Sequence, residues 1–399
     1  MTKPLPLFVT GTARSGSTLL SQMLNANKEV RIASDPYLHL FRSLRNAAVR
    51  YKAPPDLQES FDPRCPLQDY YFTDERIRLM DTIQASDLNI PYDTQEWDGF
   101  YEASLTRAEY ECADLIPYLN QLMGSTYKEM FDNGLHIIAK ARLGYNCKWV
   151  GFKEVWVIEF FASLARAYPE ACFVVILRDP RAIALSNLAY FERDPSQVGH
   201  MLSYARHWRK YVAFSQHYQN QPLFANRLYF LKYEQLVKEP EQNARELCNF
   251  LGINYDPDML DTTKYFHYST GCLWQGNSTF EKTIAGISAR SVNRWRTRLN
   301  PKVLKMIDFI CSPDMKLVDY ETHTTDQWPD SGILDYIIQS DKEYSNWRSD
   351  LGYPQQDYGF ELFRRALLTL PERTLDSNLI RRSFLFEDVF TQIRQHKMG

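Results

Sequence analysis

The most constraining feature of this sequence is an apolar run, a small-residue loop and an amphipathic helix that follow one another near the N-terminus. Residues Leu5–Thr10 are mostly apolar and are bounded by proline and glycine, which is typical of a buried strand. After the loop, the segment Ser17–Asn25 places its leucines and its methionine on one helical face. This order predicts the first strand and helix of an α/β fold with a mainly parallel sheet.

The loop itself, Gly11–Thr18, reads G-T-A-R-S-G-S-T and has the frame G-x-x-x-x-G-x-[ST]. Its glycines let backbone amides approach an oxyanion, and the following helix presents its positive end. Ser17 stands where ATPases and GTPases keep a lysine, and the cation of this loop is Arg14 instead. The loop therefore predicts a site for a phosphate or sulfate group, and a tight glycine turn without a ligand is the alternative. The candidate binding residues are Arg14, Ser15, Gly16, Ser17 and Thr18.

Further strands and helices alternate along the chain. The segment Cys172–Leu177 is a continuous apolar run, C-F-V-V-I-L, of the kind found in parallel sheets. Other predicted strands are His136–Ala139, Trp149–Lys153 and Arg227–Lys232. Predicted helices are Trp156–Tyr168, Pro180–Tyr190, Gly199–Gln219, Glu239–Leu251 and Asn300–Phe309. The alternation predicts an α/β fold in three layers, with a P-loop-like site at the first loop.

Two regions interrupt or follow this alternation. About residues 40–135 are irregular and rich in proline and aromatic residues, and we expect a helical insertion that serves as a lid or binds an acceptor. Residues 313–399 are polar and aromatic, with helices predicted at Glu361–Thr369 and Phe384–His396. We therefore predict one main domain over residues 1–312 and a C-terminal extension packed on it.

A second anion motif, R-D-P-R-A-I-A-L-S-N, begins at Arg178, directly after the strongest strand signal. Ligands of open α/β sheets bind beyond the carboxyl ends of strands, where Arg178 is expected. Ser186 lies two helical turns further on, so that an arginine and a helical hydroxyl could hold a second phosphate together. The alternative is a local ion pair between Arg178 and Asp179, with Ser186 as a surface hydroxyl.

Composition excludes several function classes. The 399 residues carry 46 Lys and Arg against 49 Asp and Glu, a formal net charge of −3, which argues against a nucleic-acid-binding or membrane-attracted surface. No apolar run is long enough to span a bilayer, and the N-terminus turns polar too soon for a secretory signal. The 7 cysteines are an odd number without a C-x-x-C pair. They favour a reduced, cytoplasmic protein.

The two anion motifs together resemble those of the PAPS-dependent sulfotransferase family, where PAPS is 3′-phosphoadenosine 5′-phosphosulfate. G-T-A-R-S-G-S-T-L-L resembles the family's 5′-phosphosulfate loop, and R-D-P-R-A-I-A-L-S-N resembles its 3′-phosphate motif. Three further segments are similar in order and spacing: Gly151–Val155, Leu231–Glu241 and Asn277–Arg296. The resemblance covers about residues 5–310 and implies the P-loop-like α/β fold of that family.

The resemblance also implies a reaction, namely transfer of a sulfuryl group from PAPS to an acceptor hydroxyl or amine with release of 3′,5′-ADP. Lys153 resembles the lysine that bridges the leaving group and a sulfuryl oxygen, and Tyr233 resembles a residue near the adenine. Arg14 is also a candidate catalytic residue, because with the loop amides it would stabilise the negative charge that develops during transfer. Arg290 lies where a late loop would approach the 3′-phosphate, although the sequence there departs from the Arg-Lys-Gly of the steroid and phenol enzymes. No metal cluster is visible in the sequence, and the implied chemistry needs none.

The general base is the least defined part of the resemblance. Val155 stands where the phenol and steroid enzymes keep a histidine, so the chain resembles the members that use a carboxylate, often after the first helix. Asp35 is then the preferred candidate, and Glu154 and His39 are the alternatives. Each also has a structural interpretation: a turn former for Asp35, a partner of Lys153 for Glu154, and core packing for His39.

The expected function is therefore sulfation of a small-molecule or glycan-like acceptor, without nucleic-acid or membrane partners. A P-loop nucleotide kinase is one alternative, disfavoured by Ser17 and by the lack of an obvious acidic strand end for magnesium. A nucleotide-binding module without transferase activity is another, and the retained Lys153 argues against it. The sequence does not define the acceptor or the oligomeric state.

Overall fold

The computed structural model describes residues 3–190, 201–268, 270–274, 276, 286–322, 359–371 and 375–398. The chain divides into two compact units, which we describe separately. The first contains Met1–Gln58, Asp81–Leu177 and Pro222–Ala289, and the second contains Glu59–Met80, Arg178–Gln221 and Arg290–Gly399. The division of the chain at residue 312 stays a prediction.

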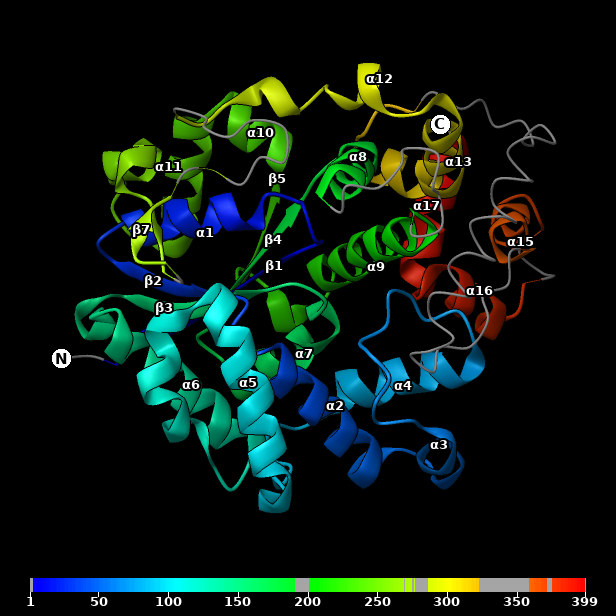
Figure 1. Ribbon diagram of the computed structural model, residues 1–399. Helices are drawn as coiled ribbons and strands as arrows, with labels where there is room; N and C mark the ends of the chain where they lie inside the picture. Colours follow the sequence, from blue (N-terminus) through cyan, green and yellow to red (C-terminus); the bar gives the residue numbers. More distant parts are fainter. Residues whose placement is uncertain are drawn as a thin grey trace. The chain divides into compact units, whose positions relative to one another are not determined.

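The first unit is built on a five-stranded, wholly parallel sheet in the order β2-β3-β1-β4-β5 (Figure 1). Its strands are β1 (Leu5–Gly11), β2 (Val30–Ser34), β3 (Trp149–Glu154), β4 (Cys172–Leu177) and β5 (Leu228–Lys232). Every residue of β3 and β4 is buried, because parallel strands are covered on both faces. The predicted parallel α/β sheet is confirmed.

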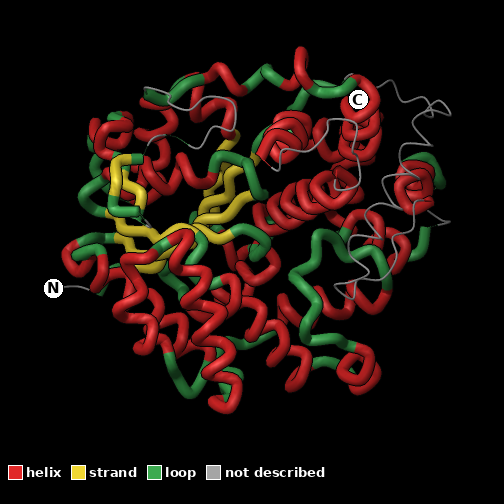
Figure 2. The backbone as a smooth tube through the Cα atoms, viewed as in Figure 1, coloured by secondary structure: helices red, strands yellow, loops and turns green. Residues whose placement is uncertain are grey.

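Helices cover both faces of this sheet, as Figures 1 and 2 show. One face carries α1 (Ser17–Ala26), α10 (Tyr233–Lys238) and α11 (Pro240–Leu251). The other carries α2 (Leu38–Lys52), α5 (Trp97–Glu111), α6 (Tyr127–Ala141) and α7 (Phe161–Ala167). These are the three layers that the alternation predicts.

A row of phenylalanines fixes the packing of the second face. Phe8 lies opposite both Phe152 and Phe173 in the strand register, and its ring centroid is 5.1 and 5.4 Å from theirs. Phe41 of α2 and Phe161 of α7 pack onto this row, at 5.9 Å from Phe152 and 4.8 Å from Phe173. Buried aromatic pairs of this kind add about 0.5–1.5 kcal/mol each beyond their area burial. The row anchors β1 and β3, whose ends carry the site described below.

The second unit is helical in its described part. Its helices include α8 (Pro180–Tyr190), α9 (Met201–Gln219), α12 (Trp295–Arg298), α13 (Pro301–Leu317), α15 (Gly359–Leu367), α16 (Ser377–Phe384) and α17 (Glu387–Met398). Glu361 of α15 is paired with two buried arginines of α9, Arg206 and Arg209. Their charges lower the pKa of Glu361 to about 2 despite its burial. Two helices, α3 (Pro55–Ser60) and α4 (Asp74–Ala85), contribute residues to both units.

Several predicted elements differ from the structure. The strand at His136–Ala139 is wrong, because these residues lie inside α6, an amphipathic helix that Thr126 caps at the Glu129 amide. A short apolar run fits the periodicity of a strand and that of a helix equally well, and the helix cap at Thr126, upstream of the run, indicates the helix. The segment Trp156–Tyr168 is only partly α-helical, since a 3₁₀ turn at Ile158–Phe160 precedes α7. Leu385, at φ 67°, separates α16 from α17 inside the helix predicted at Phe384–His396.

Three described strands have no counterpart in the sequence prediction: β2 and the short antiparallel pair β6 (Phe266–His267) and β7 (Cys272–Leu273). The remaining predicted strands and helices lie close to their predicted positions, and residues Gly199 and His200 at the start of one predicted helix lie outside the described residues. Among the described helices, none combines the length and the apolar character that a membrane span requires.

Candidate active site

The glycine loop joins the end of β1 to the start of α1 and lies at the carboxyl edge of the sheet. Because the strands are parallel and Val9 is in register with Lys153, the ends of β1 and β3 meet at that same edge. Two loop residues, Arg14 at φ 68° and Gly16 at φ 93°, adopt left-handed backbone conformations. The predicted strand–loop–helix arrangement is present, with the loop directly beside the end of β3.

Both the left-handed backbone at residue 16 and the neighbouring Tyr233 side chain require a glycine there. A Cβ atom added at Gly16 would overlap the ring of Tyr233, the first residue of α10. The structure thus brings Tyr233 against the loop, where the residue is 9% exposed. An aromatic ring in this position can form one wall for a ligand held by the loop.

The loop has the features of an anion site. Within the described residues, the buried hydroxyls of Thr12 and Ser15 have no hydrogen-bond partner. Gly16 is the N-cap residue of α1, and no side chain of the described residues caps this helix, so its positive end stays available. Ser17 is buried at the start of α1, while Arg14 and Thr18 are partly exposed. Unpaired buried donors beside a helix N-terminus fit a phosphate or sulfate group.

We expect Gly16→Ala to weaken anion binding and to destabilise the protein. The Cβ atom would displace the Tyr233 ring and force alanine into a left-handed conformation, which costs about 1–3 kcal/mol. Gly99→Ala is the matched control, because a Cβ at this exposed site on α5 meets no atom within 4 Å. Thermal unfolding and calorimetry of anion binding should show a loss for Gly16→Ala alone. Equal behaviour of the two variants would contradict the assigned role of Gly16.

Asp35 and Lys153 form the centre of a second group of side chains at this edge. Asp35 follows β2 and its backbone N–H donates to the Lys153 carbonyl oxygen at 2.6 Å, which extends the pairing of β2 with β3 by one residue. The Lys153 ammonium donates to Asp35 Oδ2, and the Val155 amide donates to Asp35 Oδ1 at 3.3 Å. Asp35 holds this position in a left-handed conformation, at φ 52°. The structure therefore brings Asp35 and Lys153 together.

Glu154 belongs to the same group but points into the protein. Its Oε1 accepts the Tyr37 amide proton, its Oε2 lies 3.6 Å from Arg107 Nη2, and its side chain is 0% exposed. Burial, reinforced by the Asp35 charge, raises the pKa of Glu154 to about 8, although Arg107 and the Tyr37 amide act in the opposite direction. The sequence analysis gave Lys153 as a possible structural partner of Glu154. In the structure, Glu154 instead lies beside Arg107.

Arg107 is a residue of this site that the sequence analysis missed. Its Nε donates to the Asp35 carbonyl oxygen at 2.7 Å, and its Nη2 lies 3.8 Å from Asp35 Oδ1. It comes from α5, inside the predicted insertion. No feature of the sequence singles it out, because residues three and four apart share one face in any helix.

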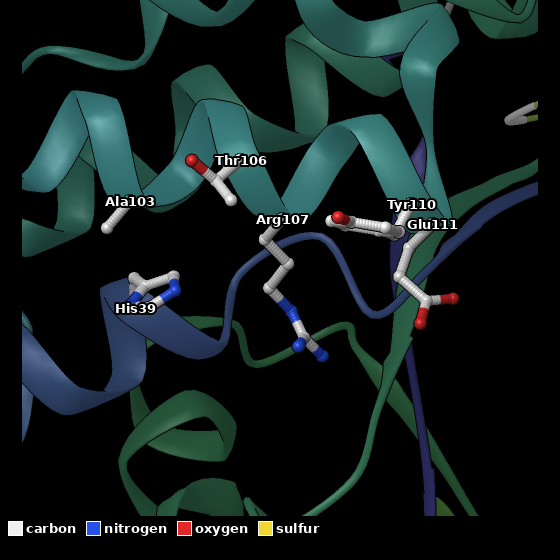
Figure 3. A pocket seen from close by; sticks show the side chains of 6 residues that line it. All are labelled: His39, Ala103, Thr106, Arg107, Tyr110 and Glu111. Carbon is white, nitrogen blue, oxygen red and sulfur yellow. The ribbon is translucent and has the colours of Figure 1, made fainter.

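The face of α5 that carries Arg107 lines a pocket of about 420 Å³, together with His39 at the start of α2 (Figure 3). The Arg107 side chain extends from α5 between His39 and Glu111, and the Glu111 carboxyl group turns the same way. Burial and the nearby Arg42 and Arg107 charges lower the pKa of His39 to about 4. His39 is therefore uncharged at neutral pH and is a weak proton acceptor there.

The remaining predicted residues lie in the second unit. Arg178, directly after β4, is 8% exposed; its Nη2 donates to the Ser291 carbonyl oxygen at 3.5 Å, and its own carbonyl accepts from Trp208. Asp179 forms an ion pair with Arg181, with 2.7 Å between Asp179 Oδ2 and Arg181 Nη2. Ser186 is 7% exposed on α8, so it is not a surface hydroxyl.

Arg290 is exposed in a 3₁₀ turn, Ala289–Ser291. Residues 277–285 of its predicted loop, Asn277–Arg296, lie outside the described residues.

Comparisons with known proteins agree on one family. The model of the "Sulfotransferase family" matches residues 6–257. The chain is 23% identical to carbohydrate sulfotransferase 3 of Tetronarce californica over 163 residues, which is 37% of this chain and 35% of that protein. It is 22% identical to a putative protein-tyrosine sulfotransferase of Caenorhabditis briggsae over 207 residues, 49% of this chain and 67% of that protein.

Solved structures are similar as well. The sulfotransferase domain from the curacin biosynthetic pathway is 14% identical, with a TM-score of 0.43, over 81% of this chain and 100% of that domain. The match to carbohydrate sulfotransferase 3 spans about a third of that protein's length, 35%.

Proposed function

The chain belongs to the sulfotransferase family, and we propose that it moves a sulfuryl group from PAPS to a hydroxyl or amine of a small-molecule or glycan-like acceptor. The observation that carries this proposal is the pairing of Lys153 with Asp35 at the end of β3, next to the glycine loop at the end of β1. A fixed cation, a proton acceptor and an anion-binding loop can together support such a transfer.

When bound, PAPS supplies the sulfuryl group and leaves as 3′,5′-ADP. In our proposal the loop amides, with Arg14, Ser15, Gly16, Ser17 and Thr18, hold the 5′ end of the nucleotide. The unpaired Ser15 hydroxyl and the uncapped start of α1 support this role. The Tyr233 ring packs against Gly16, and we propose that it contacts the adenine.

Arg178, Ser186 and Arg290 are proposed to bind the 3′-phosphate, the group that distinguishes PAPS from ordinary nucleotides. The guanidinium groups donate charge-assisted hydrogen bonds, and the hydroxyl of Ser186 donates one more. This part of the proposal rests on the motif at Arg178–Asn187 and on family membership.

On the acceptor side, we assign Asp35 as the group that takes the proton from the acceptor hydroxyl. A carboxylate has about four lone-pair positions, so Asp35 can accept a hydroxyl in addition to Lys153 and the Val155 amide. Lys153 stabilises the negative charge that develops on the leaving oxygen. Glu154 and His39 are less suited, because Glu154 is fully buried and His39 has a lowered pKa.

Two further proposals concern the domain boundaries and the cellular location of the protein. The transferase domain spans residues 1–312, with the insertion at about residues 40–135 supplying acceptor contacts through α5 and the segment 313–399 as an extension. We propose a cytoplasmic location, since all seven cysteines are free thiols and six of them are buried. The site needs no resident metal in this proposal.

Nucleotide selectivity tests the donor assignment. We expect 3′,5′-ADP and PAPS to bind at least tenfold more tightly than ADP or ATP, because each charge-assisted contact to the 3′-phosphate is worth about 1.5–3 kcal/mol. Calorimetry with the four nucleotides measures this directly. Preference for ATP would favour a nucleotide kinase, and equal affinity for ADP and 3′,5′-ADP would refute the assignment.

A further inference from the structure

A single arginine side chain connects two parts of the first unit that are far apart in the sequence. Arg107 lies on α5, and its Nε donates to the backbone carbonyl oxygen of Asp35 at 2.7 Å. Its Nη2 lies 3.8 Å from Asp35 Oδ1. The planar guanidinium group allows both contacts at once, because its N–H groups point in fixed directions. Arg107 thus contacts both the backbone and the carboxyl group of the residue that we assign as the proton acceptor.

The backbone of Asp35 adopts a conformation that depends on such contacts. Its φ of 52° lies in the left-handed region, which is uncommon outside glycine, and a residue before a proline, here Pro36, favours extended backbone. The Asp35 N–H donates to the Lys153 carbonyl oxygen, and the Asp35 carbonyl oxygen accepts from Arg107. Hydrogen bonds therefore hold the peptide groups on both sides of this residue, and these bonds fix where its carboxyl group points.

Glu154 lies close to Arg107 but leaves most of the arginine's charge to Asp35. Glu154 Oε2 is 3.6 Å from Arg107 Nη2 and has no hydrogen-bond partner among the described residues. Burial raises the pKa of Glu154 to about 8, against the opposing charge of Arg107. The Glu154 carboxyl group is therefore mostly protonated at pH 7, and the charge of Arg107 is directed mainly to Asp35.

The helix that carries Arg107 also lines the pocket of about 420 Å³. Tyr110 and Glu111 line it from the same face of α5, and His39 lines it from the start of α2 (Figure 3). This volume falls in the usual range of small-molecule sites, about 300–1,000 Å³. An acceptor bound there would rest on the same helix that holds Asp35.

We propose that Arg107 is a positioning residue, which holds Asp35 at a fixed place relative to the helix that lines the acceptor pocket. The inference rests on the proposed function, since it assigns a role in the same proton transfer. Arg107 itself takes up no proton, because a guanidinium group stays protonated in proteins. Its effect on the reaction passes through the direction of the Asp35 carboxyl group.

The first test is Arg107→Met, which keeps a long side chain but removes both contacts to Asp35. We expect the single-turnover rate with an alcohol acceptor to fall about 10²-fold, the cost of a misplacement of about 1 Å. The rate with a nitrophenol acceptor should fall less, because an acidic hydroxyl needs less help from a base. Calorimetry should show an unchanged affinity for 3′,5′-ADP. An unchanged rate with the alcohol would overturn the proposal.

A double-mutant cycle tests whether Arg107 acts through Asp35. In the Asp35→Asn background, Arg107→Met should have almost no further effect on the rate with the alcohol acceptor, because no base remains to be misplaced. A purely structural role would not produce this dependence. If Arg107→Met lowers the rate by the same factor in both backgrounds, Arg107 acts independently of Asp35 and the proposal is wrong.

Arg142→Met is the matched control for loss of stability. Arg142 donates to the Ile32 carbonyl oxygen of β2 and forms an ion pair with Asp114 at 2.8 Å, so it makes the same kinds of contact away from Asp35. Its removal should lower the thermal stability but leave the ratio of the alcohol and nitrophenol rates at the wild-type value. An equal change of this ratio in Arg142→Met and Arg107→Met would overturn the specific role of Arg107.

Arg107→Lys keeps the inference testable if Arg107→Met does not fold. Lysine retains the positive charge, but one ammonium group on a shorter side chain does not reproduce the fixed fork of the guanidinium group. The alcohol rate should therefore fall severalfold, and the nitrophenol rate less. Wild-type rates in Arg107→Lys would contradict the need for both contacts.

The failure of this inference can be distinguished from a failure of the proposed function. If the wild-type chain sulfates no acceptor of a pooled library, the proposed function fails, and this inference with it. If the wild-type chain is active and Asp35→Asn is slow, but Arg107→Met retains the wild-type rate, the sulfotransferase proposal stands and the positioning role of Arg107 is wrong.

Discussion

Asp35→Asn should lower the rate of sulfation of an alcohol acceptor about 10²–10⁴-fold, the usual contribution of a positioned general base. The amide keeps the shape of the carboxylate but cannot take up the acceptor's proton. Lys153 and Arg107 lie beside the Asp35 carboxylate and hold it in position.

Asparagine is the substitution that isolates this effect. Asp35 has a left-handed backbone at φ 52°, which asparagine tolerates better than other residues. The amide oxygen of asparagine can still accept a hydrogen bond from Lys153, and the backbone contacts to Lys153 and Arg107 do not depend on the side chain. The variant should therefore fold normally and bind 3′,5′-ADP with nearly wild-type affinity.

Single-turnover rates with two acceptors check the assignment. An acceptor whose hydroxyl is already acidic, such as a nitrophenol, needs less help from a base and should lose less rate than a simple alcohol. The parallel variants Glu154→Gln and His39→Ala should have smaller effects than Asp35→Asn. If Asp35→Asn is nearly silent and one of these two is not, the base is a different residue.

Lys153→Ala should remove most of the turnover while leaving nucleotide affinity largely intact. A cation that acts mainly on transition-state charge behaves like an oxyanion-hole donor, whose loss costs about 2.7–4 kcal/mol, or about 10²–10³ in rate. Lys153 is 2% exposed and paired with Asp35, so it has a defined position in the site. Arg107, at 3.8 Å, remains as a partner for Asp35 after the substitution.

The matched control is Lys148→Ala. Lys148 immediately precedes β3 and donates to the Gly252 carbonyl oxygen at the opposite end of the strand from Lys153. Its removal should change stability slightly and the chemical step not at all. Wild-type single-turnover rates in Lys153→Ala would show that the lysine has no part in the chemistry.

The fold was predictable where its signals are local. The glycine loop, the apolar run at Cys172–Leu177 and the glycine that ends α11 each lie within a few residues, and the structure has β1, β4 and α11 at these places. Lys153 was found through the motif around it. The register of β1 with β3 then places its backbone at the edge where the glycine loop begins.

The remaining features depend on contacts between distant residues. The strand β2, V-R-I-A-S, has a weak apolar pattern and forms because β3 offers an edge for pairing. The helix α6 contains an apolar run that fits a strand equally well until its cap is considered. Arg107 meets Asp35 across 72 residues of chain, so no local motif could predict the contact.

The most direct test of the central claim is sulfuryl transfer itself, measured by mass spectrometry with labelled PAPS and a pooled library of hydroxyl and amine acceptors. The account predicts a sulfated product and an equal amount of 3′,5′-ADP from the wild-type chain, with both nearly absent for Lys153→Ala. Tight binding of 3′,5′-ADP without sulfation of any acceptor would contradict it, and would identify the chain as a nucleotide-binding module.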